Sequence, residues 1–281
     1  MADLHVNGAL MKKSTQLALL LLLALTAGIA SAQSIALAPA QIVEEFKPGV
    51  PFEYALAVEN SGSQPVELHV QITDFWYNDK NEKLFGAPGT SPRSAANWIQ
   101  FVPEKFEVPA GGTQKMKAII TPPVDARGGY YAVLFVESKP LDSKQETKDG
   151  KRVFTNMRIG CLVMLTAKGT EAYNVGVNDL KLTPPSDNQS LKLTFGVDNE
   201  SNTHVFPQAR LAIMNPEHKL AGKAETQMKR FLPGQKDSMQ VDWNGDLNAG
   251  DYTAVLSLVY GGTRVETIQV AFTVPAKTAS K

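Results

Sequence analysis

The residue types that most often carry catalysis are present, but they are not arranged as a catalytic motif. The four histidines are dispersed along the chain, at His5, His69, His204 and His218. None of them forms the His-Glu-x-x-His pair that binds zinc on one face of a helix. The chain also lacks the Gly-x-Ser-x-Gly elbow of serine hydrolases and a Gly-rich phosphate-binding loop. We therefore expect no enzyme, no catalytic residue and no cofactor.

The residue types that bind metals lead to a similar expectation. Residues 242–246 (DWNGD) place acidic residues around a glycine, but they lack the spacing and the distal glutamate of a calcium loop, so we interpret them as a turn. Cys161 is the only cysteine, which excludes an intramolecular disulfide and a cysteine-based metal cluster. Because Cys161 lies in an apolar run, we interpret it as a small buried hydrophobe rather than a reactive thiol. We expect no metal site.

Charge and the N-terminal pattern limit the partners and the location. Lys plus Arg and Asp plus Glu each total 28, so no basic excess indicates nucleic acid. Two lysines precede an apolar run over residues 17–27, which is followed by the small-x-small site ASA at 30–32, the pattern of a cleavable signal peptide. Translation could begin at Met1 or at Met11. The run is shorter than the roughly 20 residues of a membrane span, so we expect export to the periplasm without stable membrane insertion.

The rest of the chain has the pattern of tandem β-sandwiches. Residues 114–121 and 130–136 are two strand-like runs, separated by prolines and glycines, in which every second residue shares a face. The expected buried faces hold Met116, Ala118 and Ile120 in the first run and Tyr131, Val133 and Phe135 in the second. A similar passage returns at residues 232–259. We therefore predict an all-β protein with two tandem immunoglobulin-like antiparallel sandwiches after the signal peptide. The expected divisions are an N-terminal extension and signal peptide at 1–32, a first domain at 33–170 and a second domain at 171–281.

Several features occur in an order that resembles the periplasmic pilus-assembly chaperones, the PapD-like family. The first predicted strand, 34–43, is interrupted by Pro39, and the second ends in VEN at 58–60. A PAGG turn at 109–112, the strand at 130–137, a polar loop at 139–152 and a long strand at 153–167 follow. The similarity covers most of residues 34–170 and extends more loosely over the C-terminal half, and the chain departs from the family far enough to be a divergent member.

The resemblance implies that a strand is lent to a pilus subunit whose own sandwich lacks one. The lending strand would be residues 153–165, and alternate side chains would fill the groove of the subunit. The expected subunit-binding residues are Met157, Arg158, Ile159, Cys161 and Val163. Family members hold the carboxylate of the subunit with two basic residues. Arg158 resembles the second of these, whereas the first strand has no Arg or Lys and offers only Gln41.

Two functions follow from these patterns. The first is an exported chaperone-like protein that binds pilus, fimbrium or other cell-surface subunits by edge-strand donation, with Arg158 pairing a client carboxylate. The alternative is a structural or adhesive cell-envelope module without chaperone activity, which binds protein or glycan through loops such as residues 86–97. In that case the strand at 153–165 simply closes its own sandwich. A hydrolase is a more distant third reading.

Overall fold

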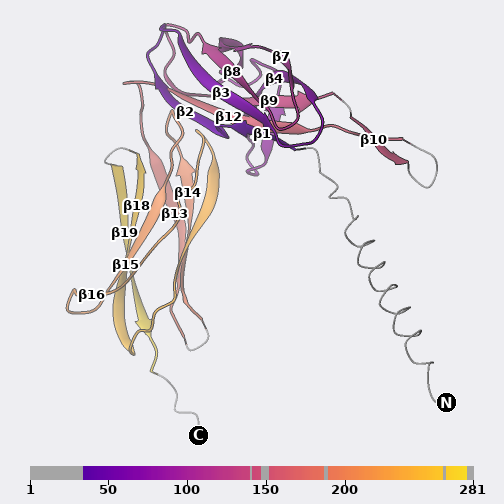
Figure 1. The fold of residues 1–281 in the computed structure, drawn as a ribbon. Helices are drawn as coiled ribbons and strands as arrows, with labels where there is room; N and C mark the ends of the chain where they lie inside the picture. Colours follow the sequence, from indigo (N-terminus) through magenta and orange to yellow (C-terminus); the bar gives the residue numbers. More distant parts are fainter. Residues whose placement is uncertain (1–33, 140, 147–151, 187–188, 262–263, 277–281) are drawn as a thin grey trace, which may run out of the picture.

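The computed structural model describes residues 34–139, 141–146, 152–186, 189–261 and 264–276. The described chain is built from β-strands, with a single short 3-10 helix, η1 (Ala96–Trp98), as its helical element. The expected signal peptide lies outside the described residues. No helix in the described ranges is long and apolar enough to cross a membrane. Figure 1 shows two groups of strands that follow one another along the sequence.

Two facing sheets form the first sandwich, in agreement with the all-β prediction. One sheet has the order β1-β3-β8-β6, and the other has the order β2-β12-β9-β4-β5, with β7 also paired to β4. Their strands are β1 (Ile35–Ala38), β2 (Gln41–Phe46), β3 (Phe52–Asn60), β4 (Val66–Tyr77), β5 (Lys83–Gly86), β6 (Ile99–Val102), β7 (Lys105–Val108), β8 (Thr113–Ile120), β9 (Gly128–Ser138) and β12 (Arg158–Ala167).

The chain changes sheet at Pro39, as the interrupted first strand predicted. β1 forms an edge of one sheet and β2 forms an edge of the other. Proline has no N–H to give to a ladder, so a strand that contains it is best placed at an edge or broken there. β2 runs parallel to β12, with Gln41 opposite Leu162 and Phe46 opposite Ala167.

Alternate residues of the strands fill the first core. The core cluster takes apolar side chains from both sheets, because successive side chains of a strand point to opposite faces. Its fully buried members include Ile42, Val58, Leu68, Ile120, Leu134, Cys161 and Leu165. The burial of Cys161 confirms its interpretation as a small core hydrophobe.

The second sandwich has the sheets β13-β14-β17 and β16-β15-β18-β19. Its strands are β13 (Val175–Thr183), β14 (Leu191–Asn199), β15 (Gln208–Met214), β16 (Leu220–Glu225), β17 (Lys236–Trp243), β18 (Gly250–Gly261) and β19 (Arg264–Val274). No sheet of the described residues contains strands from both sides of residues 168–174. We propose that the domain boundary lies in this segment.

A buried asparagine closes the same turn in each sandwich, which supports the repeat noted in the sequence. The Asn60 side chain donates to the carbonyls of Val108 and Pro109, both at 3.1 Å. The Asn199 side chain donates to the carbonyls of Thr203 at 3.0 Å and Phe231 at 3.1 Å. Each amide thus satisfies carbonyl groups that would otherwise be buried without a partner.

Two sequence predictions between residues 139 and 167 were wrong. Residues 139–152 were expected to be a loop, but β10 (Leu141–Glu146) and β11 (Arg152–Thr155) pair as an antiparallel hairpin. The expected long strand over 153–167 is divided into β11 and β12. Alternation of apolar and polar residues predicts only strands that have a buried face. This hairpin instead continues β9 and β12, which are already paired where they leave the sheet.

Candidate functional site

The predicted subunit-binding residues lie on β12 or immediately before it, and they do not share one environment. Cys161 and Val163 are fully buried in the core of their own sandwich. Met157 and Ile159 pack against the edge of that core and are only partly buried. Arg158 points to the opposite face and its side chain is 48% exposed. The accessible part of the expected donor strand is therefore its first half.

The backbone of that half forms a free sheet edge. β2 pairs with β12 only from Leu162 to Ala167, and none of the described strands pairs with residues 158–161 on that side. The Met157 carbonyl accepts from the Ser138 N–H at 2.9 Å, whereas the Leu162 N–H donates to the Ala40 carbonyl at 3.2 Å. Backbone groups alternate in direction along an antiparallel strand.

It follows that the N–H and C=O groups of Arg158 and Gly160 point away from β9, toward the free edge. We call residues 158–161 the β12 edge. Unpaired edge groups of this kind are a template for a further strand.

Aromatic packing covers the outer face of the β12 edge. A Cβ atom added to Gly160 would lie 2.9 Å from Cε1 of Phe135, so glycine allows this ring to lie over the strand. The Arg158 guanidinium lies 3.7 Å from the centroid of the Phe135 ring. Phe85 packs edge-on against Phe135 with the ring centroids 5.7 Å apart, and it is 51% exposed. The outer face therefore combines a cation with accessible aromatic surface.

Arg158 already has a carboxylate partner. It forms an ion pair with Glu137, which lies directly opposite it on β9. His69 Nε2 lies 3.4 Å from the same carboxylate. Glu137 is much less exposed than Arg158, at 19% of its side chain. An incoming carboxylate would have to share the guanidinium with Glu137.

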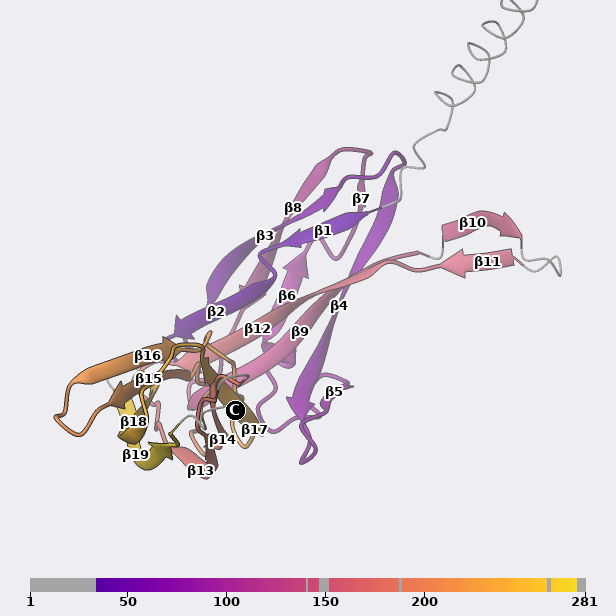
Figure 2. The ribbon, with the colours of Figure 1, turned by 90° about the horizontal axis from the view of Figure 1, so that it is seen from below.

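The β10–β11 hairpin continues β9 and β12 beyond the sandwich. Figure 2 shows it projecting from the end of the sheet where β12 begins. Leu141 pairs with Thr155, and Glu146 pairs with Arg152. An extended ribbon therefore leads directly into the β12 edge.

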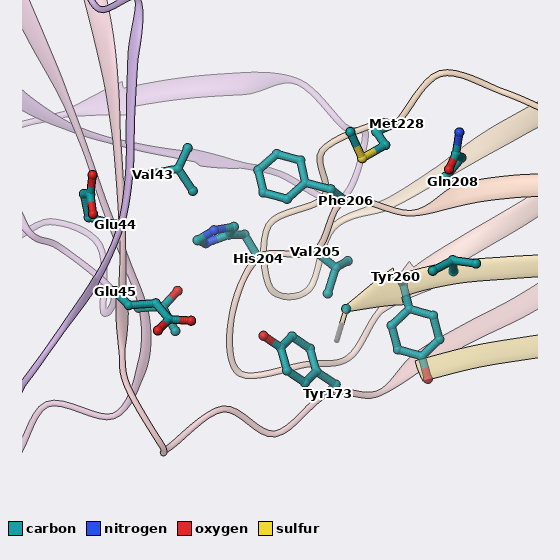
Figure 3. Close-up of a pocket in the computed structure, with 13 residues that line it drawn as sticks. Val43, Glu44, Glu45, Tyr173, His204, Val205, Phe206, Gln208, Met228 and Tyr260 are labelled. Atoms are coloured by element: carbon teal, nitrogen blue, oxygen red, sulfur yellow. The ribbon is translucent and has the colours of Figure 1, made fainter. Parts of the chain in front are cut away.

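A second candidate site is the cleft between the sandwiches (Figure 3). It encloses about 510 Å³. Val43, Glu44 and Glu45 of β2 line one side, and the segment of His204 and Phe206 lines the other. The described residues that line it include two glutamates and no Lys or Arg, so its charge does not favour an anion.

Burial and a nearby cation act on the histidine of this cleft. Desolvation, with a smaller contribution from Arg230, lowers the pKa of His204 to about 4. The Tyr131 hydroxyl lies 3.5 Å from its Nδ1. The hydroxyls of Thr166 and Thr203 lie 2.9 Å apart across the same interface. The first contact joins the two sandwiches through the imidazole, and the second joins them through a pair of hydroxyls.

The cleft and Arg158 lie at opposite ends of β12. Thr166 lines the cleft, and Arg158 lies eight positions before it in the extended strand, a distance of about 26 Å. The first strand supplies no Lys or Arg that could form a two-residue basic clamp with Arg158. Gln41, the polar residue of that strand, lies opposite Leu162.

Sequence reasoning missed Glu137 and Phe135, the two β9 residues that contact Arg158. The register of the β9–β12 pair, in which Arg158 faces Glu137 and Gly160 faces Phe135, would have indicated both. A glycine inside a strand was the available signal, because it often marks a close approach of another group. Across the described ranges, no cluster of three or more His, Cys, Asp or Glu residues could hold a metal ion.

The fold and the site define an all-β protein of two sandwiches with an unpaired sheet edge, the kind of surface that binds an extended segment. No protein-family model matches the chain. No curated protein matches it either.

Solved structures do match. The class 5 fimbriae chaperone CfaA is 13% identical, with a TM-score of 0.45, and the match covers 86% of this chain and 100% of that one. A Salmonella enterica complex of the SafA pilin with the SafB chaperone is 10% identical, with a TM-score of 0.42 and coverage of 87% and 98%. The Pseudomonas aeruginosa CupB2 chaperone is 12% identical, with a TM-score of 0.39 and coverage of 84% and 99%. These likenesses assign no functional residue to this chain.

Proposed function

We propose that this protein is an exported, periplasmic, non-enzymatic chaperone-like protein that binds pilus or other cell-surface subunits at the β12 edge. The observation that carries the proposal is the unpaired backbone of residues 158–161. Along β12, the pairing with β2 begins just after these residues, and the β10–β11 hairpin lies just before them. A client strand added there would pair with the free edge of β12 and extend the sheet by one strand.

Met157, Ile159 and Arg158 supply the side-chain contacts of this proposal. Met157 and Ile159 are only partly covered by their own core, so they can fill apolar positions of a client strand. Cys161 and Val163 act differently, because they anchor the strand in its own sandwich and hold the edge rigid. The rigid edge lowers the entropy lost when a client strand is added.

Capture of a subunit tests the proposal. The mature chain, residues 33–281, is incubated with the extracytoplasmic fraction of its host, and stoichiometric partners are identified by mass spectrometry. Ile159→Asp should abolish capture, because it places a charge in the apolar contact. Val265→Asp is the matched control, since Val265 is an exposed apolar residue on β19, an edge strand of the second sandwich. Equal capture by both folded variants would refute binding at the β12 edge.

A second pair of variants separates the backbone from the side chain. Arg158→Pro removes the outward N–H together with the guanidinium, whereas Arg158→Ala removes the guanidinium alone. If backbone pairing drives binding, the proline variant should bind at least about tenfold more weakly than the alanine variant. Glu137→Gln leaves Arg158 without its partner and should strengthen binding of a client segment that carries a carboxylate.

The alternative function is a cell-envelope module that binds through residues 86–97. The buried Asp74 holds this loop, accepting from the Ser91 N–H at 2.8 Å and from the Ser94 hydroxyl at 2.5 Å. A partner retained by Ile159→Asp and lost on Asp74→Asn would favour this module over strand addition.

A further inference from the structure

The cleft between the sandwiches has aromatic walls that strand addition at the β12 edge does not use. His204 and Phe206 pack edge-on, with their ring centroids 5.4 Å apart. Figure 3 shows both rings on the side of the second sandwich, opposite Glu45 of β2. Tyr173 and Tyr260 also line the cleft. Its volume of about 510 Å³ falls within the usual range of small-ligand sites.

A glycine brings one of these rings close to a carboxylate. A Cβ atom added to Gly261, at the end of β18, would lie 2.9 Å from Cε1 of Tyr173. The ring therefore lies against the β18 backbone, and Figure 3 shows its hydroxyl directed toward Glu45. Burial first, and then the charges of Glu171 and Glu45, raise the pKa of Tyr173. An aromatic ring and a carboxylate thus lie near one another in the cleft.

The charged side chains that line the cleft are acidic. They are Glu44 and Glu45, with no Lys or Arg among the described lining residues. Lys168 lies outside the lining and pairs with Glu45 at 3.3 Å, but both side chains are more than half exposed, so water screens this pair. Arg230, which acts on His204, also lies outside the lining. An incoming cation can therefore replace Lys168 at Glu45.

Exposed apolar side chains lie beside the carboxylate. Val43 precedes Glu45 by two residues on β2, so the two side chains share a face of the strand, and Val43 is exposed. Met228 of the second sandwich is largely exposed where it lines the cleft. Such surface suits the aliphatic stem of a side chain or ligand whose far end is charged.

We propose that this cleft binds a guanidinium group carried by an aliphatic chain. A guanidinium is planar, stacks on aromatic faces and pairs with a carboxylate through two parallel hydrogen bonds. Tyr173 and Phe206 supply the rings, and Glu45 accepts the hydrogen bonds. Val43 and Met228 cover the aliphatic stem. This site goes beyond strand addition at the β12 edge and does not depend on it.

Binding of N-acetylargininamide to the mature chain, followed by amide NMR titration, tests the proposal. N-acetylcitrullinamide has the same shape without the charge and should bind at least about fivefold more weakly. Glu45→Gln should weaken binding of the arginine derivative by at least about threefold. Tyr173→Leu should do the same, whereas Tyr173→Phe keeps the ring and should bind as the wild type does. The amide signals of Thr166 and Gly261, which line the cleft, should shift on binding.

Glu53→Gln is the matched control for Glu45→Gln. Glu53 pairs with Lys117 as Glu45 pairs with Lys168, and the two glutamate side chains are 55% and 57% exposed. The control should bind as the wild type does. Equal affinity for the arginine and citrulline derivatives, or wild-type binding by folded Glu45→Gln, would overturn the proposal. So would the absence of shifts at about 10 mM N-acetylargininamide, about the weakest affinity that a site of this size allows.

Two further ligands identify the source and the kind of cation. The acetylated and amidated peptide Ala-Ala-Arg-Ala-Ala should bind more tightly than N-acetylargininamide if the guanidinium belongs to a protein partner, and more weakly if it belongs to a small free molecule. Choline cannot donate to Glu45, so tighter binding of choline than of the arginine derivative would overturn the assignment of a guanidinium. Glu45→Gln carries the test if Tyr173→Leu does not fold. Ile159→Asp should leave the binding unchanged, so failure here is distinct from failure at the β12 edge.

Discussion

Acidification should weaken the junction between the sandwiches through His204. This side chain is only 8% exposed, and its imidazole packs edge-on against the rings of Tyr131 and Phe206. Burial lowers its pKa from 6.5 to about 4, and the nearby Arg230 guanidinium adds to the effect. Between pH 6.5 and about pH 4, His204 is therefore protonated more readily in the unfolded chain than in the folded chain.

The sign and size of the effect follow from the two pKa values. Because the folded pKa lies below the unfolded pKa, the contribution to stability is present above pH 6.5 and is lost as the pH falls toward 4. One pKa unit corresponds to about 1.4 kcal/mol, so the free energy of unfolding should fall by about 2 kcal/mol between pH 7.5 and pH 5 through this group alone.

Urea unfolding of the wild type and of His204→Gln at both pH values measures this loss. Subtracting the change in the free energy of unfolding of the variant from that of the wild type removes the contributions of the other titrating groups. The wild type should lose about 2 kcal/mol more than the variant on acidification. A wild-type-minus-His204→Gln difference that stays constant from pH 7.5 to pH 5 would show that the imidazole is not held neutral by burial.

Three further predictions concern packing and reactivity. Gly128 has φ +70°, and a Cβ there would lie 2.3 Å from the Asn202 carbonyl oxygen across the junction, whereas Gly111 has φ +66° and open space. Gly128→Ala should therefore lower the thermal midpoint more than Gly111→Ala, which costs only about 1 kcal/mol, and equal shifts would contradict the close contact. Leu134→Ala removes a fully buried core side chain and should cost about 2–5 kcal/mol in urea unfolding; a loss below about 1 kcal/mol would argue against this core. Burial raises the pKa of Cys161 to about 11, so at pH 8 only about one thiol in a thousand is ionised. A disulfide reagent should therefore label Cys161 only after unfolding. Rapid labelling of the native protein would place the thiol at the surface.

The sequence predicted the strands wherever alternation marks a buried face. Met116 and Ala118 of β8 are buried on the face that the pattern predicts. In β9 the sandwich core takes Leu134 and Val136, whereas Tyr131 and Val133, from the face that the pattern favoured, are buried in a separate cluster. The β10–β11 hairpin was missed, because its polar sequence carries no such alternation.

The candidate site was only partly predictable. Alternation placed Met157, Ile159, Cys161 and Val163 on one face of a strand, and this face does turn toward the core. It could not show how much of that face its own sandwich would cover. The coverage depends on where β2 stops pairing with β12, at Leu162, which is a long-range register rather than a local pattern.

By itself, the sequence determined the fold class, because the period-two pattern is a local property that each strand carries in its own residues. Only the tertiary structure decided which backbone stays unpaired among the described strands and that Arg158 faces Glu137. Contacts of this kind join residues far apart in the chain. Side-chain spacing does not encode them, because they depend on how whole sheets pair and pack.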